Sequence, residues 1–517
     1  MAQHRRNRLL IWFWVTWILI SLACNYPSPP AVVTHPAVEA LRQTLDAVAT
    51  EQPARHATQA AMGVWTPTGA VPQASVEPGR LIVEGNLAHY IVRSGDTLAA
   101  LAGRFGVDPA SIRSELPIPA DGLIPEGLEL LIPYTLGEIM PQPPLLPDSE
   151  VIESPTSIDF NPVDFINQAG GYLASYHEQF NGQTLSGAQI VQRVARESSI
   201  NPRLLLALLE FRSGWVTQKL PPTSSITYPL GFRIPAWQGL YREMIMAATH
   251  LNAGYYGWRS GALIEIQFSE GRRLRLNPEQ NAGTIALQNL FARLYPTETS
   301  WREALYGAQN FYTLYQQLFG DAWSRADTLG PLFPPGVTQP ELELPFPPGE
   351  RWSFTGGPHP SWKTGSPRGA IDFAPVTGEP RCAVSRAWVT ASAPGVITRS
   401  ERNVVALDLD GDGYEQTGWV LIYLHVADFE RVAVGQRVAQ DERIGHPSCE
   451  GGATTGTHIH LARKYNGEWI AADRPLPFVL SGWQVFADER NYLGELRRDG
   501  QVVVASPVGP RTSIIVR

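Results

Sequence analysis

Four histidines and one aspartate in the last third of this 517-residue chain stand in surroundings suited to metal binding and proton transfer. In the segment GTHIHLA, His458 and His460 are two residues apart, so in a strand both side chains point to one face. Imidazole is a good zinc ligand and also accepts protons near neutral pH, so two on one face can divide these tasks. Such pairs are also common on ordinary surface strands, so the pair alone does not establish a site.

Three further residues could complete a site with this pair. His425 ends the apolar run WVLIYL, a position where a lone histidine is more often structural. His359 lies in a Gly- and Pro-rich loop, within FTGGPHPSW. Asp372 stands between two apolar neighbours in the text AIDFAP, and an isolated buried carboxylate is costly unless a cation compensates it. A metal ion would be such a cation.

The residues that would position these side chains are expected to form an antiparallel β domain over 350–517. This part of the chain contains short strand-like runs such as VVALDLD, WVLIYLHV and THIHLARKY. Gly, Pro and Asn interrupt the runs, which is typical of strands joined by turns.

Taken in order, these segments resemble the lysostaphin-type, or LytM-type, zinc metallopeptidases over about residues 350–475. Members of that family present a His and an Asp early, a His after an apolar strand, and a His-x-His pair late. Their usual early form is His-x-x-x-Asp, and here Arg368 occupies the position four before Asp372. The longer spacing from His359, with the segment PSWKTGSPRGAI between, resembles the beta-lytic subgroup instead.

The resemblance implies a set of roles for the five residues. His359, Asp372 and His460 would bind Zn²⁺, leaving a fourth position for water as a catalytic zinc site requires. His425 and His458 would transfer protons and stabilise the oxyanion. The implied activity is that of a zinc metalloendopeptidase acting on the peptide part of bacterial peptidoglycan. No HExxH motif occurs, so a mechanism with a glutamate base on such a helix does not apply.

A second class of function stays open at this point. Some relatives of the family are non-enzymatic peptidoglycan-binding scaffolds or activators with a degenerate peptidase domain. They are recognisable because ligand positions are replaced, whereas all five candidate residues are present here.

Residues 1–23 are expected to be an export signal, because three arginines precede an apolar run that ends at Ala23. The run is short for a membrane span. It resembles a bacterial lipoprotein signal, in which Cys24 would become the lipidated first residue and anchor the protein to the membrane. An uncleaved anchor and plain secretion are the alternatives. Each version places the protein outside the cytoplasm, in the cell envelope.

The other two cysteines are expected to pair. If Cys24 is lipidated, only Cys382 and Cys449 remain, and an oxidising compartment favours a disulfide between them. Two buried free thiols are the alternative. The texts PSCEGG and ASAPGVI near the two cysteines also resemble the beta-lytic subgroup, which favours the disulfide.

Residues 88–134 are expected to form a small βααβ module. A strand and a turn lead to a helix that Thr97 could cap, Asp108 starts a second helix, and LELLIP closes the module as a strand. With GDTL at the first helix, the segment resembles a LysM domain. The resemblance implies binding of peptidoglycan glycan, with Gly95, Asp96 and Thr97 as contact residues. A packing module without a ligand is the alternative.

Residues 159–328 are expected to form an all-α middle domain. Asn201 and Pro202 are good cap and first-turn residues, and LLLALLEF follows them. The stretch weakly resembles the catalytic helix of lysozyme-like transglycosylases, which carry a Glu directly before Ser-Gly. Arg212 occupies that place and Glu210 lies two residues earlier, so a non-catalytic domain is favoured and glycan cleavage at Glu210 is the alternative.

Composition agrees with modules joined by spacers. Prolines, of which the chain has 44, are dense in an expected tether over 24–87 and in expected linkers over 135–158 and 329–349. The net charge of −8 offers no basic surface, so nucleic acid is disfavoured as a partner.

One acidic turn, DLDGDG, allows two interpretations. Asp408, Asp410 and Asp412 are spaced like the start of an EF-hand calcium loop, but Trp419 stands where that loop needs a glutamate. A β-hairpin turn is the favoured interpretation, and weak calcium binding is the alternative.

Overall fold

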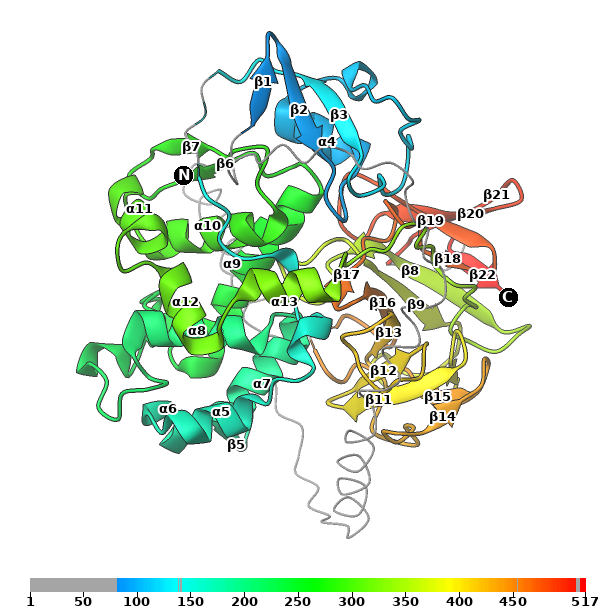
Figure 1. The fold of residues 1–517 in the computed structure, drawn as a ribbon. Coiled ribbons are helices and arrows are strands. Elements are labelled where there is room, and N and C mark those ends of the chain that lie inside the picture. The colour runs from blue at the N-terminus through cyan, green and yellow to red at the C-terminus, as the bar shows by residue number, and fades with distance from the viewer. Residues whose placement is uncertain (1–80, 138, 140–141, 453, 508–511) are drawn as a thin grey trace, which may run out of the picture. The chain divides into compact units, whose positions relative to one another are not determined.

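The computed structural model describes residues 81–517 except 138, 140–141, 453 and 508–511. The predicted signal, Cys24 and nearly all of the tether lie outside these residues. Among the residues described, no helix is long and apolar enough to cross a membrane. A small N-terminal module, a helical part and a C-terminal β part follow one another along the chain (Figure 1).

The N-terminal module is a three-stranded antiparallel sheet with one helix, built from β1 (Ile82–Glu84), β2 (Leu87–Ile91), α4 (Leu98–Phe105) and β3 (Glu129–Pro133). The predicted cap is confirmed, because the Thr97 hydroxyl accepts a hydrogen bond from the amide of Ala100. The predicted second helix is wrong. Asp108 starts only a 3₁₀ turn over Pro109–Ser111, because the sequence ELPIPA that follows contains two prolines that cannot continue a helix.

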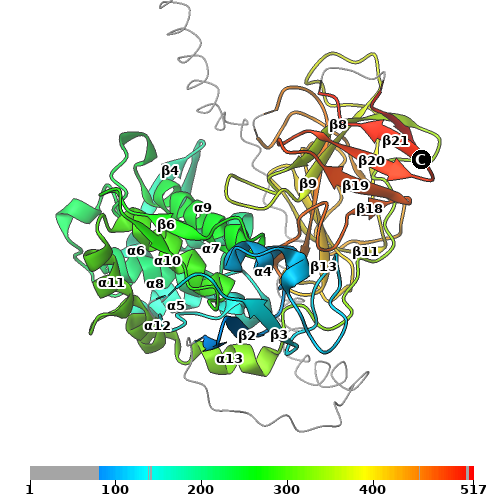
Figure 2. The same ribbon diagram turned by 90° about the horizontal axis from the view of Figure 1, so that it is seen from above.

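The middle part is helical, as predicted, but it is not all-α, since it also contains two short hairpins. Asn201 caps α8 by accepting from the amide of Arg203, and Gly214 ends the helix with a left-handed φ of 68°. In both views of the ribbon, α8, α9 and α10 gather at the centre of this part (Figures 1 and 2). The helices are α5 (Pro162–Ala169), α6 (Tyr172–Ser175), α7 (Gly187–Ser198), α8 (Pro202–Ser213), α9 (Leu240–Arg259), α10 (Ala282–Leu294), α11 (Glu298–Tyr306), α12 (Phe311–Phe319) and α13 (Ala322–Leu329), and the hairpins are β4–β5 (His177–Phe180, Gln183–Ser186) and β6–β7 (Glu265–Gln267, Arg273–Arg275).

The C-terminal part is antiparallel β, as predicted. Its main sheet has nine strands in the order β14-β11-β12-β13-β16-β9-β8-β22, with β17 paired to β16. A second sheet runs β18-β19-β20-β21, and β10 pairs with β15. The strands are β8 (Arg351–His359), β9 (Ala370–Pro375), β10 (Val389–Thr390), β11 (Gly395–Glu401), β12 (Val404–Asp408), β13 (Trp419–Leu424), β14 (Arg437–Val438), β15 (Arg443–Gly445), β16 (Ile459–Tyr465), β17 (Glu468–Trp469), β18 (Val479–Leu480), β19 (Trp483–Ala487), β20 (Gly494–Arg498), β21 (Gln501–Val504) and β22 (Ile514–Val516).

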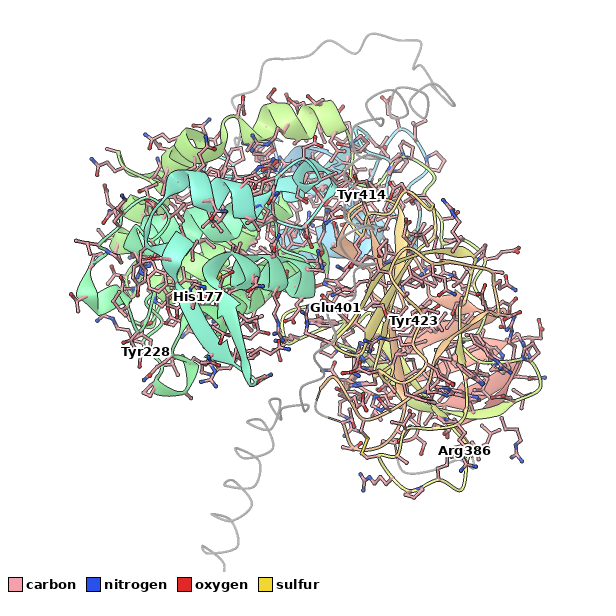
Figure 3. All side chains as sticks on the ribbon, turned by 90° about the horizontal axis from the view of Figure 1, so that it is seen from below. His177, Tyr228, Arg386, Glu401, Tyr414 and Tyr423 are labelled. Atoms are coloured by element: carbon pink, nitrogen blue, oxygen red, sulfur yellow. A yellow bond between two sulfur atoms is a disulfide. The ribbon has the colours of Figure 1, made fainter. Side chains whose placement is uncertain are left out.

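The two faces of the main sheet pack in different cores. Side chains alternate along a strand, so Ile422 and Ala462 lie on one face while Tyr423 and Leu461 lie on the other. The first pair belongs to the same buried cluster as the helical part, and the second pair belongs to a separate cluster within the β part. The helical part therefore covers one face of the sheet, and Glu401, at the end of β11, lies where the two parts meet (Figure 3).

The Pro-rich segments predicted as linkers are packed rather than free. The segment 329–349 contains no strand and only the end of α13, yet Leu344 and Phe346 are fully buried in the β core and Leu332 in the core shared with the helices. The segment 135–158 likewise contributes Leu146 and Ile152 to the helical core. These side chains bury apolar surface, so both segments are integral parts of the fold.

Candidate metal centre

Three of the predicted residues meet at one point in the β part. His359 Nε2 lies 3.0 Å from His460 Nδ1, and both nitrogens approach Asp372 Oδ1, at 3.3 and 3.4 Å respectively. The three side chains are 3–7% exposed. The structure thus brings together the residues predicted as zinc ligands, whose metal-binding role stays a prediction.

Neighbouring strands create this meeting point. His460 on β16 pairs directly with Asp372 on β9, and β8 flanks β9 on the other side. The register of β8 shifts on both sides of Gly356, and such irregularities re-aim the side chains that follow. A Cβ at Gly356 would lie 2.4 Å from Asp372 Oδ2, so only glycine leaves room for this carboxylate.

The hydrogen bonds of His359 and His460 determine which ring nitrogens face the cluster. His359 Nδ1 is 2.8 Å from the Gly357 carbonyl, and His460 Nε2 is 2.9 Å from the Ser361 carbonyl. A carbonyl oxygen can only accept a hydrogen bond, so His359 Nδ1 and His460 Nε2 carry the ring protons. The other nitrogen of each ring has a lone pair, and these two nitrogens face each other. Two lone pairs and a carboxylate oxygen facing one another require a positive charge between them.

The donor set fits zinc in identity and spacing. Ligands about 2.0–2.1 Å from a tetrahedral zinc lie about 3.3–3.4 Å apart, close to the separations of the two nitrogens and the carboxylate oxygen. Asp372 Oδ1 is also buried without a hydrogen-bond donor among the described residues. A buried anion without a donor is expensive, and a cation in the cluster would remove that cost.

The remaining two predicted residues lie beside the cluster. The ring centroids of His425 and His458 are 4.6 Å apart, and His458 Nε2 is 3.9 Å from Asp372 Oδ1. Each ring donates its Nδ1 proton to a backbone carbonyl 2.7 Å away, that of Glu450 for His425 and that of Gly456 for His458. Both rings therefore keep Nε2 as a proton acceptor. His425 also has a left-handed φ of 70°, a strain of roughly 1–3 kcal/mol that often marks functional sites.

Burial and mutual charge set the protonation of the cluster. Burial and the neighbouring His458 lower the pKa of His425 to about 3, which keeps this ring neutral. Burial alone would raise the pKa of Asp372, but His359 and His458 hold it well below its usual range. Burial opposes protonation of His359, yet Asp372 raises its pKa, which again shows that the site favours positive charge.

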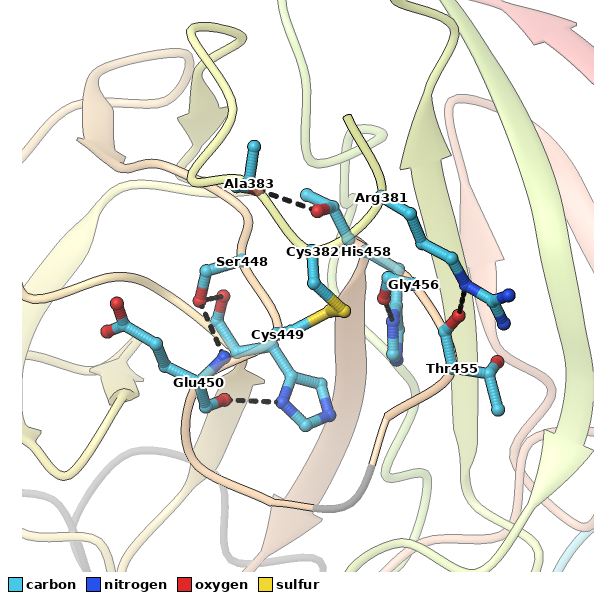
Figure 4. Close-up of a disulfide and its surroundings, with 11 residues drawn as sticks. Arg381, Cys382, Ala383, Ser448, Cys449, Glu450, Thr455, Gly456 and His458 are labelled. Atoms are coloured by element: carbon cyan, nitrogen blue, oxygen red, sulfur yellow. Dashed lines mark hydrogen bonds between the residues drawn. A yellow bond between two sulfur atoms is a disulfide. The ribbon is translucent and has the colours of Figure 1, made fainter. Parts of the chain in front are cut away.

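The predicted disulfide between Cys382 and Cys449 is confirmed, and it borders the site (Figure 4). Glu450, which follows Cys449, supplies the carbonyl that holds His425. The amide of Ser448 donates to the carbonyl of His425 itself at 2.8 Å. The disulfide thus fixes the loop that orients one of the two predicted proton-transfer residues.

Replacing Cys382 and Cys449 together with alanine is expected to lower the free energy of unfolding by about 2–5 kcal/mol, because the bridge closes a loop with a sequence separation of 67 residues. Denaturant titration under non-reducing conditions measures this. A reductant should bring the wild type close to the double variant and leave the variant unchanged. Equal unfolding midpoints of the two oxidised proteins would contradict the prediction.

Two neighbours of the cluster were not expected from the sequence. The ring of Tyr492 stacks on the ring of His359 at a centroid distance of 4.2 Å. The backbone carbonyl of Tyr492 accepts a hydrogen bond from the amide of Gly357. Arg368, at the position of the family's usual first histidine, donates to the carbonyls of Pro358, Asp488 and Arg490. Asp488 and Arg490 belong to the C-terminal extension, residues 476–517, which follows the region of family resemblance. Arg368 therefore ties this extension to the end of β8. Nothing in the sequence around Tyr492 marks it, because only the fold brings it to His359.

The residues predicted to contact glycan have partners inside the protein. Asp96 is 2% exposed and accepts hydrogen bonds from Arg104 and Tyr90, each at 2.7 Å. A Cβ at Gly95 would lie 2.1 Å from the guanidinium of Arg259 on α9, and Thr97 caps α4. Glycan binding by this module stays a prediction, and the Asp96 carboxylate has a structural role instead.

Two other sequence features also have structural explanations. The carboxylate of Glu210 accepts from the amides of Val216 and Thr217 and from the Thr217 hydroxyl, so it closes the loop after α8 and does not support glycan cleavage. The carboxylate of Asp408 accepts from three backbone amides of its own turn, which agrees with the hairpin-turn interpretation.

Comparisons with known proteins agree with two of these parts. Residues 366–472 match the family described as peptidase family M23, and residues 144–332 match the family described as the N-terminal domain of LasA. Over 296 residues the chain is 26% identical to protease LasA of Pseudomonas aeruginosa strain UCBPP-PA14, which covers 53% of this chain and 65% of that protein. Over 159 residues it is 28% identical to the beta-lytic metalloendopeptidase of Achromobacter lyticus, covering 29% of this chain and 39% of that protein.

Among solved structures, the M23 metalloprotease pseudoalterin from the deep sea aligns with 35% of this chain and all of its own, at 22% identity and a TM-score of 0.29. Because this TM-score is low, the similarity to peptidase family M23 and to LasA rests on the sequence matches. The chain spans 65% of the length of the LasA protein. The C-terminal β part of this chain is therefore similar to peptidase family M23, and the helical part before it is similar to the N-terminal domain of LasA.

Proposed function

We propose that this protein is a zinc metalloendopeptidase that hydrolyses peptide bonds in bacterial cell-wall peptide. The observation that carries the proposal is the meeting of two imidazole nitrogens and the Asp372 oxygen, an arrangement that favours a bound cation. The match of residues 366–472 to peptidase family M23 supports a peptidase role.

The residues around the cluster have distinct tasks in this proposal. His359, Asp372 and His460 hold the metal, and zinc bound there supplies Lewis acidity that polarises a carbonyl and lowers the pKa of nearby water. His425 and His458 each present Nε2 as a proton acceptor, since Nδ1 is bonded to a carbonyl. Once protonated, either ring can donate a hydrogen bond to a developing oxyanion.

The proposal includes a location and partners. The LysM-like module would bind the glycan of peptidoglycan, and the M23-like domain would bind its peptide. Lipidated Cys24 would anchor the protein to the membrane, outside the cytoplasm. The net charge of −8 argues against nucleic acid as a partner.

Metal removal tests the proposal on the full chain from residue 24. A fragment starting at residue 350 would expose the sheet face that packs on the helices, so it is not a suitable substitute. We expect about one zinc per chain, release of peptide fragments from muropeptides, a loss of at least about 100-fold after chelation, and recovery on adding zinc. A folded protein that retains no zinc and cleaves no muropeptide would instead support the non-enzymatic scaffold.

A further inference from the structure

The predicted metal ligands lie on the face of the sheet that the helical part covers. On β16, His460 and Ala462 point to the same face, because they are two residues apart. Ala462 packs in the core that contains the helices. The helical part therefore adjoins the ligand-bearing face, and its side chains can reach the loops around the histidine cluster.

One buried carboxylate of the helical part does reach these loops. Glu197, near the end of α7, is 5% exposed and accepts hydrogen bonds from Arg193 and from the Tyr241 hydroxyl, both at 2.8 Å. Across the domain boundary it faces Lys363 Nζ at 4.0 Å and Arg402 Nε at 3.7 Å. Burial alone would raise the pKa of Glu197, but Lys363, Arg193 and Arg402 hold it below its usual range, so the carboxylate is charged.

Lys363 is the cation that lies near the predicted metal ligand His460. It belongs to the loop between β8 and β9, two residues after Ser361, whose carbonyl accepts from His460 Nε2. The same loop packs on the helical part, since a Cβ at Gly365 would lie 2.4 Å from the Thr249 carbonyl on α9. Lys363 therefore stands on the segment that supports one predicted ligand.

The second cation that faces Glu197 is Arg402, in the turn between β11 and β12. Its neighbour Asn403 donates to the carbonyl of Val426 and to the carboxylate of Glu450, the residue whose carbonyl holds His425. Arg402 also pairs with Glu401, the residue before it, at 2.7 Å. Arg402 thus precedes a residue that contacts the loop holding His425, a predicted proton-transfer residue. The Glu197 carboxylate lies within 4.0 Å of both cations.

We propose that Lys363 and Arg402 form a subsite for a carboxylate of the peptide substrate, and that Glu197 occupies this subsite in the present arrangement. This inference rests on the peptidase function proposed above and narrows its substrates to peptides with a free carboxylate near the scissile bond. Both cations are solvent-accessible, with side chains 43% and 37% exposed, so a dissolved anion can approach them. Opposite charge at such a site selects among ligands more than it adds affinity.

Binding to metal-free full-length protein tests the subsite without catalysis. The probes are a short cell-wall peptide with one free carboxylate and the same peptide with that group amidated. Replacing Glu197 with glutamine should raise the ratio of acid to amide affinity about fivefold, the size expected for partly exposed ion pairs. Adding Arg402→Gln or Lys363→Gln to that variant should return the ratio to near one.

Arg196→Gln is the matched control. Arg196 lies on the same helix and pairs across the same boundary with Glu401 at 3.6 Å, so its loss loosens the boundary without removing either cation of the subsite. Its ratio of affinities should equal that of the wild type. The inference would be overturned if Glu197→Gln changed the affinities for the acid and the amide peptide equally. It would also be overturned if the raised ratio of acid to amide affinity persisted after Lys363 or Arg402 was replaced. Because no metal is present, failure of the peptidase proposal would appear separately, as absent zinc binding and absent cleavage.

Discussion

Replacing His359 with alanine is expected to lower peptidase activity by roughly 10²- to 10³-fold and to reduce zinc content well below one per chain. The variant removes one of the two lone pairs at the cluster and leaves Asp372 and His460 as the remaining predicted ligands. The measurements are elemental zinc analysis and muropeptide digestion by the full chain. This residue is the most informative target, because the usual family position of the first ligand belongs to Arg368.

Two further variants separate loss of a ligand from general damage. Arg368→Ala should retain zinc, since its guanidinium donates to the backbone carbonyls of Pro358, Asp488 and Arg490 and offers no metal ligand. His446→Ala removes a histidine of the same domain whose ring nitrogens contact the Ala387 carbonyl and Glu430, away from the cluster, and should keep both zinc and activity. Normal zinc content in His359→Ala would refute the assignment of this ligand.

Adding a single methyl group at Gly356 is expected to impair the site by about 10- to 100-fold, the range typical of changes that misplace metal ligands. In Gly356→Ala the new Cβ would meet Asp372 Oδ2 at 2.4 Å, so the carboxylate must move. The effect should appear as weaker zinc affinity and lower activity. Unfolding by denaturant should change less, because the β core on the opposite face is untouched.

Gly378→Ala provides the matched control for that variant. Gly378 belongs to the same domain, has no positive φ, and a Cβ there would meet no atom within 4 Å. This substitution should leave zinc affinity and activity at wild-type values. If Gly356→Ala binds zinc as tightly as Gly378→Ala, then the carboxylate position does not control the metal site.

Local patterns in the sequence were sufficient for much of the fold. The alternation of apolar runs and turn residues predicted the antiparallel β part, and Asn201 with Pro202 predicted the start of α8. Composition and redox compartment predicted the pairing of Cys382 with Cys449. The prediction of a second helix after Asp108 was wrong, because a cap signal starts a turn but the prolines that follow prevent its extension.

The sequence by itself indicated five residues that could carry chemistry, through their residue types, the strand alternation of His458 and His460, and the order of motifs that resembles a known family. Only the tertiary structure decided how they act together. The meeting of His359 with Asp372 depends on the irregular register of β8, and the stacking of Tyr492 depends on a return of the chain from the C-terminal extension. The burial of the Pro-rich segments and the approach of Glu197 to Lys363 and Arg402 likewise arise from contacts between residues far apart in sequence, which no local pattern encodes.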